Sequence, residues 1–351
     1  MISEINIEDY LQSFADIPTI DVRSPSEFLK GHIPGATSIP LFSDEERAHI
    51  GTVYLRQSQE GAMRLGYKYA NPKSEYYISK AREIAPQNKA VIHCWRGGMR
   101  SLTFAELLEK NGFSEVFVIN DGYKAFRKYA LDSFKRIARL CILGGYTGSG
   151  KTEILNLLIE EGIQVIDLEK LANHKGSVFG GINKGTQPTT EQFENDIFWQ
   201  WDKMDLSKPI FLEDESQSIG SVNIPVNLFG RMNEEPVIFL EIPKEERAKF
   251  LVTEYADCDR IALAAAIKKI SKRLGDLNTR KALEWLEKEN FYEVALLTLS
   301  YYDKSYKEVL LHRNPKLVHT IKLKDTNHKE NAKIVKEIIK NSHLSCCAER
   351  H

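Results

Sequence analysis

Two stretches of the 351-residue chain alternate short apolar segments with amphipathic ones. Between Ile20 and Gly122 the apolar segments are TIDV, AVIHC and EVFVIN. After residue 139 the same alternation returns with LCILGG, QVIDL, PIFLED and PVIFLEI. Such alternation is typical of a parallel sheet covered by helices. The sequence therefore predicts two α/β domains, one after the other.

The remaining segments have helical periodicity. YKAFRKYALDSFKRIA, from Tyr123, predicts a helix that connects the two domains. Residues 244–314 are rich in Lys, Glu, Ala and Leu and lack a strand pattern, which predicts a helical subdomain. KLVHTIKLKD then predicts a strand, followed by a helix in KENAKIVKEIIK. We expect domains at residues 1–130 and 131–243, with 315–342 completing the second sheet.

Composition and charge bear on the location of the protein and on the partners it can bind, and they say little about its activity. The formal net charge is -1, so a polyanionic partner has to be held by a local patch. The N-terminus carries acids where a secretory signal carries Lys or Arg, and no apolar run approaches the ~20 residues that span a bilayer. The five cysteines have neither disulfide nor zinc spacing. We expect a cytoplasmic protein that does not enter a membrane.

Cys94 stands at a predicted turn from a strand to a helix. It follows the apolar run AVIH, and apolar residues recur at helical spacing after it as far as Gly112. Backbone N–H groups of such a turn converge beside the positive end of the helix, which predicts an anion-binding loop with Cys94 as its nucleophile. Two arginines and two glycines in the loop make a merely structural cysteine the weaker interpretation. The loop residues are Trp95, Arg96, Gly97, Gly98, Met99, Arg100 and Ser101.

A second anion site is predicted where LCILGG gives way to a helix. The spacing is that of a phosphate-binding P-loop, and its residues are Gly145, Tyr146, Thr147, Gly148, Ser149, Gly150, Lys151 and Thr152. Its N–H groups are suited to a diphosphate, with Lys151 offsetting the charge and the Thr152 hydroxyl available to Mg²⁺. The motif leaves open whether the phosphates belong to ATP or to another diphosphate.

Acidic residues after two later strands are candidates for ordering Mg²⁺ or substrate. PIFLEDES resembles a Walker B strand and offers Glu213, Asp214 and Glu215, although an exposed acidic turn is the alternative. Asp167 follows the strand after the P-loop helix, where it would also serve as a helix N-cap. No metal site is fixed by these residues alone.

The first domain resembles the rhodanese family over about residues 5–130. IDVRSPSEFLKGHIPGATSIP, HCWRGGMRS and INDGYKAF carry the resemblance. It implies that Asp21, Arg23 and His32 are scaffold and that Cys94 carries a chalcogen as a persulfide or perselenide. Five residues separate Cys94 from Arg100, one more than in thiosulfate-using rhodaneses. The longer loop is also that of dual-specificity phosphatases and is suited to a phosphate-sized anion.

The order of the two domains, with GGYTGSGKT, DLEKLANHKGSVFG and EDESQSIG, resembles the tRNA 2-selenouridine synthases over nearly the whole chain. This resemblance implies that 2-thiouridine at the tRNA wobble position is geranylated with geranyl diphosphate and then converted to 2-selenouridine with selenophosphate. It implies tRNAs for Lys, Glu and Gln as substrates and a selenophosphate-supplying enzyme as a partner. We assign geranyl diphosphate to the P-loop and selenophosphate to the Cys94 loop. Whether Cys94 carries selenium or acts directly on selenophosphate is left open.

The candidate tRNA surface lies in the helical subdomain, at Lys268, Lys269, Lys272 and Arg273. A solvated helix face is the alternative. Tyr301, Tyr302 and Tyr306 are candidates for stacking on an unpaired base or for packing a helix. Rival functions are a rhodanese-type sulfurtransferase and a phosphatase fused to a P-loop kinase. The sequence assigns no role to Cys346 and Cys347.

Overall fold

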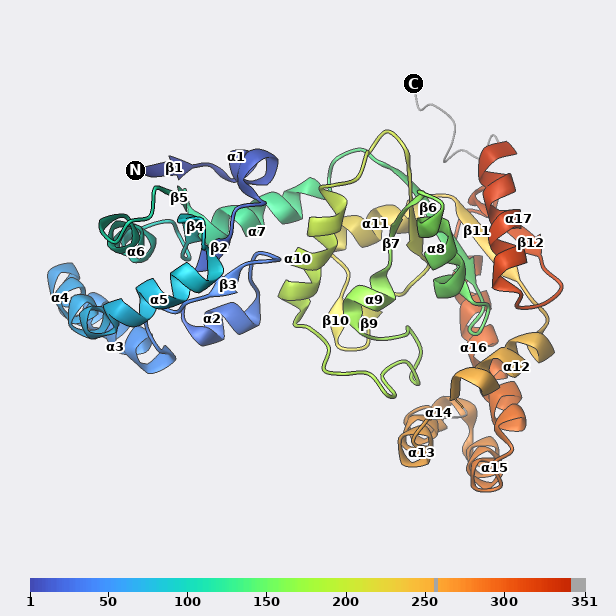
Figure 1. Cartoon of the computed structure of the whole chain (residues 1–351). Coiled ribbons are helices and arrows are strands. Elements are labelled where there is room, and N and C mark those ends of the chain that lie inside the picture. Colours follow the sequence, from blue (N-terminus) through green and yellow to red (C-terminus); the bar gives the residue numbers. More distant parts are fainter. Residues whose placement is uncertain (256–257, 342–351) are drawn as a thin grey trace. The chain divides into compact units, whose positions relative to one another are not determined.

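The computed structural model describes residues 1–255 and 258–341, so Cys346 and Cys347 lie outside the described residues. The chain divides into two compact units, Met1–Ser133 and Phe134–His351 (Figure 1). Each unit contains its own parallel sheet, which confirms the predicted α/β class. None of the described helices is both long enough and apolar enough to cross a membrane.

The first unit is a five-stranded parallel sheet in the order β1-β5-β4-β2-β3. Its strands are β1 (Ile2–Ile5), β2 (Thr19–Asp21), β3 (Thr37–Ser38), β4 (Lys89–His93) and β5 (Glu115–Ile119). Its helices are α1 (Ile7–Asp9), which continues as a π turn (Tyr10–Phe14), α2 (Pro25–Lys30), α3 (Asp44–Arg56), α4 (Gln59–Ala70), a 3-10 turn (Asn71–Lys73), α5 (Ser74–Ile84), α6 (Met99–Lys110) and α7 (Gly122–Ser133).

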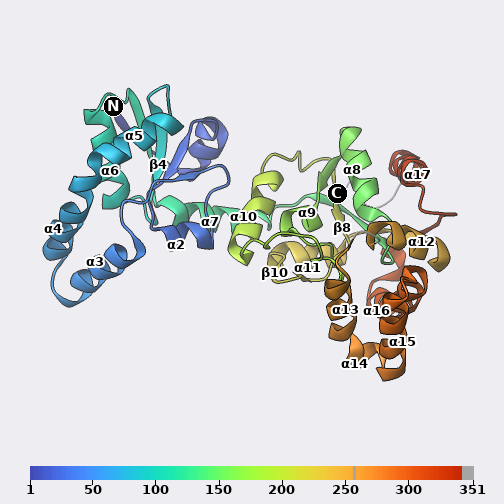
Figure 2. The ribbon, with the colours of Figure 1, turned by 60° about the horizontal axis from the view of Figure 1, so that its bottom comes forward.

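The strands of this sheet are short and rich in β-branched residues, which favour strand formation. Ile20, Val91, Ile92 and Val118 are fully buried, as expected for parallel strands covered on both faces. Helices α3 and α4 lie side by side (Figure 2). The helix predicted from Tyr123 ends earlier than expected, because α7 stops at Ser133 and residues 134–138 have no helical structure.

The second unit is a parallel sheet in the order β12-β11-β6-β8-β7. Its strands are β6 (Arg139–Gly145), β7 (Gln164–Ile166), β8 (Pro209–Glu213), β11 (Val237–Glu241) and β12 (Val318–Lys322), and β9 (Ser218–Ile219) forms a small hairpin with β10 (Val222–Asn223). Its first helices are α8 (Lys151–Glu160), α9 (Leu168–Ala172), α10 (Thr190–Trp201) and α11 (Val226–Glu234). Thus β12, far along the chain, pairs with β11 at the edge of the sheet.

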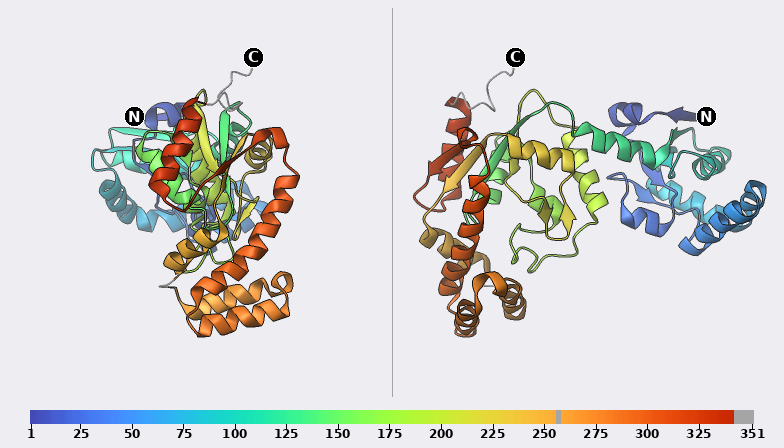
Figure 3. Two further views of the ribbon diagram at one scale, coloured as in Figure 1. Left: turned by 90° about the vertical axis from the view of Figure 1, so that its right-hand side faces the viewer. Right: turned by 180° about the vertical axis from the view of Figure 1, so that it is seen from behind.

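A helical part is inserted between β11 and β12 (Figure 3). It consists of α12 (Lys244–Tyr255), α13 (Arg260–Lys269), α14 (Ser271–Leu274), α15 (Asp276–Glu287) and α16 (Phe291–Leu311). Leu263, Ile267, Ala282 and Leu286 are buried in an apolar cluster of its own. A 3-10 turn (Pro315–Leu317) leads into β12, and α17 (His328–Asn341) follows and packs against α8.

Candidate active site

The Cys94 loop lies at the carboxyl end of β4, between that strand and α6. The chain runs from β2 outward to β3 and returns to β4 on the other side, so this is a point where the strand order reverses. Ligands of open α/β sheets bind at such points. Gly97 has φ 59°, and a Cβ there would come 2.3 Å from the Ile119 carbonyl oxygen. The tight curl of the loop therefore requires glycine.

Cys94 itself is nearly buried, with 3% of its surface exposed. Its Sγ lies 3.4 Å from the Ser101 Oγ, and the Ser101 hydroxyl also donates to the Gly98 carbonyl at 2.9 Å. The Cys94 carbonyl accepts a bond from the Tyr123 N–H at 2.9 Å. The first N–H groups of α6 have no acceptor within the helix, so they are available to an anion in front of the sulfur.

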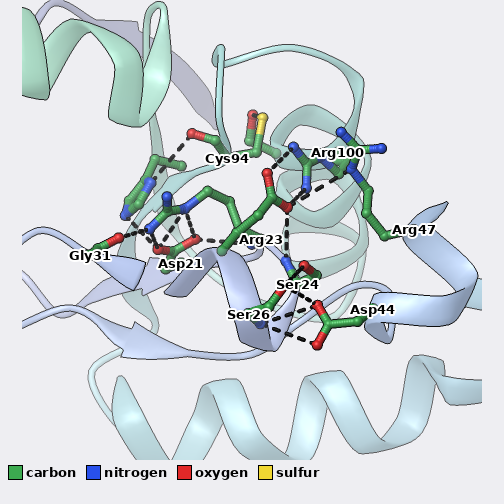
Figure 4. A network of polar contacts seen from close by, with 12 residues as sticks. Asp21, Arg23, Ser24, Ser26, Gly31, Asp44, Arg47, Cys94 and Arg100 are labelled. Atoms are coloured by element: carbon green, nitrogen blue, oxygen red, sulfur yellow. Dashed lines mark hydrogen bonds and ion pairs between the residues drawn. The ribbon is translucent and has the colours of Figure 1, made fainter. Parts of the chain in front are cut away.

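Arg100 is paired with an acid that is distant in the sequence. Its guanidinium donates to Glu27 at 2.8 Å, and Arg47 lies 3.9 Å from the same carboxylate (Figure 4). Burial alone would raise the pKa of Glu27, but its hydrogen bond and charge interaction with Arg100 lower it. Glu27 is therefore ionised and offsets part of the Arg100 charge. Arg96 is exposed and has more freedom to meet an incoming anion.

Two of the three residues that the resemblance assigns to the scaffold, Asp21 and Arg23, form a buried pair next to the loop. Arg23 donates to Asp21 at 2.6 Å and to the Gly31 carbonyl at 2.7 Å, and its guanidinium stacks 3.8 Å from the Tyr123 ring centre (Figure 4). His32 instead stacks on Phe28. These contacts tie β2, the chain after α2 and α7 together next to Cys94.

Replacing Asp21 by Asn is expected to lower the free energy of unfolding by about 3–5 kcal/mol, because it leaves a buried Arg23 without a counter-charge. Burial alone would raise the pKa of Asp21, whereas His93 and Arg23 lower it. Because burial lowers the pKa of His93, the positive charge that faces Asp21 is that of Arg23. The contribution of Asp21 is complete above its ordinary pKa of about 3.9 and is lost as the pH falls through the lower folded value.

Hydrogen exchange of the β4 amides measures this change, and Asp16→Asn, at an exposed acid, is the control. Unchanged protection of β4 in Asp21→Asn would contradict the structural role of the pair.

The P-loop joins β6 to α8 in the second unit. Gly150 has φ 72°, and a Cβ there would lie 2.4 Å from the His328 ring. Lys151 Nζ lies 3.5 Å from the Gly145 carbonyl oxygen, and Ser149 Oγ is buried without a hydrogen-bond partner. Burial acts against the charge of Lys151, but Tyr306 and the carboxylates around it raise its pKa. Lys151 is therefore a firm positive charge.

Three side chains meet at the first turn of α8. The Thr152 hydroxyl lies 2.9 Å from a carboxylate oxygen of Glu169 and 2.9 Å from one of Glu213. Burial, and then the charges of Glu169 and Asp167, raise the pKa of Glu213 well above its ordinary value. The crowded acids thus favour the protonated form of Glu213, whereas a cation bound here would favour its ionised form.

These residues fit Mg²⁺. No group of three or more His, Cys, Asp or Glu side chains within residues 1–255 and 258–341 has the arrangement of a metal site. Mg²⁺ commonly uses one or two protein oxygens, with water and substrate phosphates as its other ligands. Thr152 and Glu213 would supply the protein oxygens, and the cation would neutralise phosphate charge.

The other predicted acids lie in different surroundings. The Asp214 side chain pairs with the buried Arg313, and both residues line the P-loop cavity. Burial raises the pKa of Glu215 to about 8, although the charge of Lys151 opposes this shift. Asp167 accepts a bond from the Lys170 N–H at 2.8 Å and caps α9, which is the structural alternative raised by the sequence.

A cavity of about 470 Å³ opens over the P-loop. Lys175 and Gly176 of the DLEKLANHKGSVFG stretch lie in its wall, where the Gly176 N–H donates to Glu169. Its apolar and aromatic lining comprises Phe229, Phe250, Leu251, Tyr301, Tyr302, Tyr306 and Val309. The cavity therefore combines groups suited to phosphate with side chains suited to hydrocarbon or a flat ring, and acids such as Glu215 and Glu254 also line it.

The four cations proposed for tRNA do not share one environment. Lys268 and Lys269 are exposed at the end of α13, and Lys272 is exposed in α14. Arg273 lines the P-loop cavity and donates to the Tyr301 hydroxyl at 2.8 Å. Three lysines thus remain as an open patch, and Arg273 is separated from them as part of the cavity.

Sequence reasoning missed several residues of these sites. Glu27 lies within the rhodanese-like signature, and Glu169 lies within DLEKLANHKGSVFG. Both belong to recognised motifs, but neither was assigned a role. Arg247 is buried, donates to the Thr147 carbonyl at 3.0 Å and pairs with Asp303. Nothing in the local sequence marks it as a support of the P-loop, because its contact spans 100 residues.

Both units match families of known proteins. The family model of the tRNA 2-selenouridine synthase AAA domain matches residues 138–335, and that of the rhodanese-like domain matches residues 7–129. A protein of Nitrosomonas europaea named tRNA 2-selenouridine synthase is 33% identical over 85% of this chain and 80% of its own. Proteins of the same name from Marinobacter nauticus and a Sulfurovum species are 34% and 35% identical, over 87% and 82% of this chain and 92% and 87% of their own.

Proposed function

The chain belongs to the tRNA 2-selenouridine synthase family, and from this membership we propose that it acts on tRNA in two steps. The first step attaches a geranyl group to the sulfur of 2-thiouridine at the wobble position. The second replaces that sulfur with selenium from selenophosphate. The substrates would be the tRNAs for Lys, Glu and Gln, with selenophosphate supplied by a separate enzyme.

The composition of the P-loop cavity carries the proposal for the first step. Phosphate-binding groups and apolar side chains such as Phe250 and Leu251 line the same cavity, and they match the two halves of geranyl diphosphate. The thiocarbonyl sulfur would attack the first carbon of the geranyl chain as the bond from that carbon to the diphosphate oxygen breaks. Lys151 and the loop N–H groups would stabilise the departing diphosphate. Mg²⁺ at Thr152 and Glu213 would supply further charge neutralisation.

The second step is assigned to the Cys94 loop because its N–H groups and Arg96 are suited to a phosphate-sized anion. A selenium nucleophile would form a bond to C2 of the base as the C2–sulfur bond breaks. Cys94 would either carry that selenium or activate bound selenophosphate. Both routes need the thiol at this position, so they predict the same loss on its removal.

Nucleoside mass spectrometry tests the proposal. An anticodon stem-loop containing 2-thiouridine is incubated with the protein, Mg²⁺ and geranyl diphosphate, and then with selenophosphate. The expected products are S-geranyl-2-thiouridine after the first donor and 2-selenouridine only after both. Replacing geranyl diphosphate with ATP tests the alternative function as a kinase. Supplying thiosulfate with cyanide tests the alternative function as a sulfurtransferase. Selenouridine formed without geranyl diphosphate would contradict the two-step order.

Binding of tRNA is expected to depend on the patch of Lys268, Lys269 and Lys272. Reversing all three to Glu should weaken tRNA binding and reduce the slope of log K against log salt by up to about 3, since each lost phosphate contact removes about 0.9. Filter binding across salt concentrations measures the slope. The matched control reverses Lys124, Arg127 and Lys128 on α7. An unchanged slope in the patch variant together with a reduced slope in the control would move the tRNA surface to α7.

A further inference from the structure

A second cavity lies in the first unit, beside the Cys94 loop. Its volume is about 160 Å³, and we call it the α3–α4 groove because residues of both helices line it. The two helices are labelled in Figure 2. Met99 and Arg100, at the start of α6, form the part of its wall that belongs to the loop. The principal apolar lining comes from Leu41, Phe42, Ile50, Ala62, Met63 and Met99.

The groove is lined by small and by large apolar residues. Ala62 and Ala70 of α4 are buried in its lining, and so is Phe42. At the rim, Met63 and Met99 keep 36% and 44% of their surfaces exposed, and Tyr54 keeps 56%. Methionine is flexible and adapts to ligands of irregular shape. An apolar, partly exposed concavity next to a reactive loop is therefore suited to a hydrocarbon group attached to the reacting molecule.

We propose that the α3–α4 groove binds the prenyl chain of S-geranylated 2-thiouridine while C2 of the base reacts at the Cys94 loop. The proposal rests on the two-step function and names the determinant of its second step. The substrate of that step differs from 2-thiouridine by a purely apolar chain, and the groove is the apolar surface continuous with the loop through Met99. An apolar cavity of roughly 150 Å³ holds a benzene molecule. The groove thus encloses about one isoprene unit.

Binding the chain here also determines which group leaves. On the route in which Cys94 activates bound selenophosphate, the selenium forms a bond to C2, the C2–sulfur bond breaks, and its electron pair goes to the geranyl thiolate. One water molecule then cleaves the phosphorus–selenium bond, giving phosphate; one proton goes to the thiolate and one to N3 of the base. The products are 2-selenouridine, geranylthiol and hydrogen phosphate. A base without the chain has no hold in the groove and is a poor substrate.

The test measures selenation of two stem-loops, one with S-geranyl-2-thiouridine and one with S-methyl-2-thiouridine, by the full chain with selenophosphate. We expect the wild-type protein to prefer the S-geranyl substrate in kcat/KM by at least about tenfold, as for other apolar pockets that distinguish alkyl groups. Met63→Glu, which puts a charge in the groove, and Ala62→Phe, which fills it, should each abolish most of that preference. Leu55→Glu, at a residue of α3 that is 84% exposed and outside the lining, should preserve it.

Each outcome separates the groove from the two-step function. Wild-type protein that selenates both substrates equally would overturn the groove while leaving the two steps intact. An unchanged preference in folded Met63→Glu or Ala62→Phe would do the same. Absence of selenation of either substrate by the wild-type protein would overturn the proposed function, and the groove assignment with it. Geranylation of 2-thiouridine by each variant, which uses the P-loop, shows that the rest of the chain is intact.

Discussion

Cys94→Ala protein is expected to convert 2-thiouridine into its S-geranyl derivative and to stop there. The rate of selenation should fall by at least about a thousandfold, as is common when a catalytic side chain is removed. Geranyl transfer needs no thiol, because the sulfur of the base is itself the nucleophile in that step. The S-geranyl nucleoside should therefore accumulate, and its mass identifies it directly.

Two further variants make this result specific. Cys258→Ala removes a half-buried cysteine outside the loop and should leave both steps unchanged. Cys94→Ser retains a hydroxyl at nearly the same size, so it separates loss of the sulfur from loss of packing at a nearly buried position. Recovery of selenation in Cys94→Ser, or loss of both steps in folded Cys94→Ala, would contradict the assignment of the second step to this thiol.

The strand–turn–helix conformation of the two proposed anion loops could be predicted from sequence because each is local. A buried strand, a glycine-containing turn and a helix follow one another within a few residues, and the order of these elements fixes where the N–H groups point. The strand of residues 318–322 was equally predictable from its alternating pattern, and it completes the second sheet beside β11. Local pattern and chain order were sufficient for these features.

Partners that are distant in sequence could not be predicted in this way. Glu27 and Arg100 are 73 residues apart, and Asp214 and Arg313 are 99 apart. The acids of PIFLEDES illustrate the difficulty further. Glu213 lies next to Thr152, whereas Asp214, one residue later, pairs with Arg313 and lines the P-loop cavity. Which of them meets Thr152 depends on the register between β6 and β8, which the sequence does not state.

The early end of α7 has a similar cause. Residues 123–138 have helical periodicity, yet the helix ends at Ser133. Phe134, just beyond it, is fully buried and packs 5.7 Å from the Trp201 ring in the second unit. A tertiary contact of this kind outweighs the weak preference of a few residues for helix.

Lys151→Ala is expected to show the opposite pattern to Cys94→Ala, with geranylation reduced by about 10²–10³-fold, as for removal of one group that stabilises a developing charge. Lys151 is the lysine of the P-loop itself. Its raised pKa keeps its side chain positively charged throughout the neutral pH range. Without it, the negative charge that develops on the departing diphosphate would lose a cation that stabilises it. A stem-loop that already carries S-geranyl-2-thiouridine bypasses this step, so its selenation by Lys151→Ala should stay within about twofold of wild type. Lys208→Ala, at an exposed lysine of the same unit, is the matched control, and thermal unfolding verifies that both variants are folded. Geranylation at the wild-type rate in folded Lys151→Ala would place the geranyl donor elsewhere, and an equal loss of both steps would make the P-loop a requirement for binding tRNA instead of the prenyl donor.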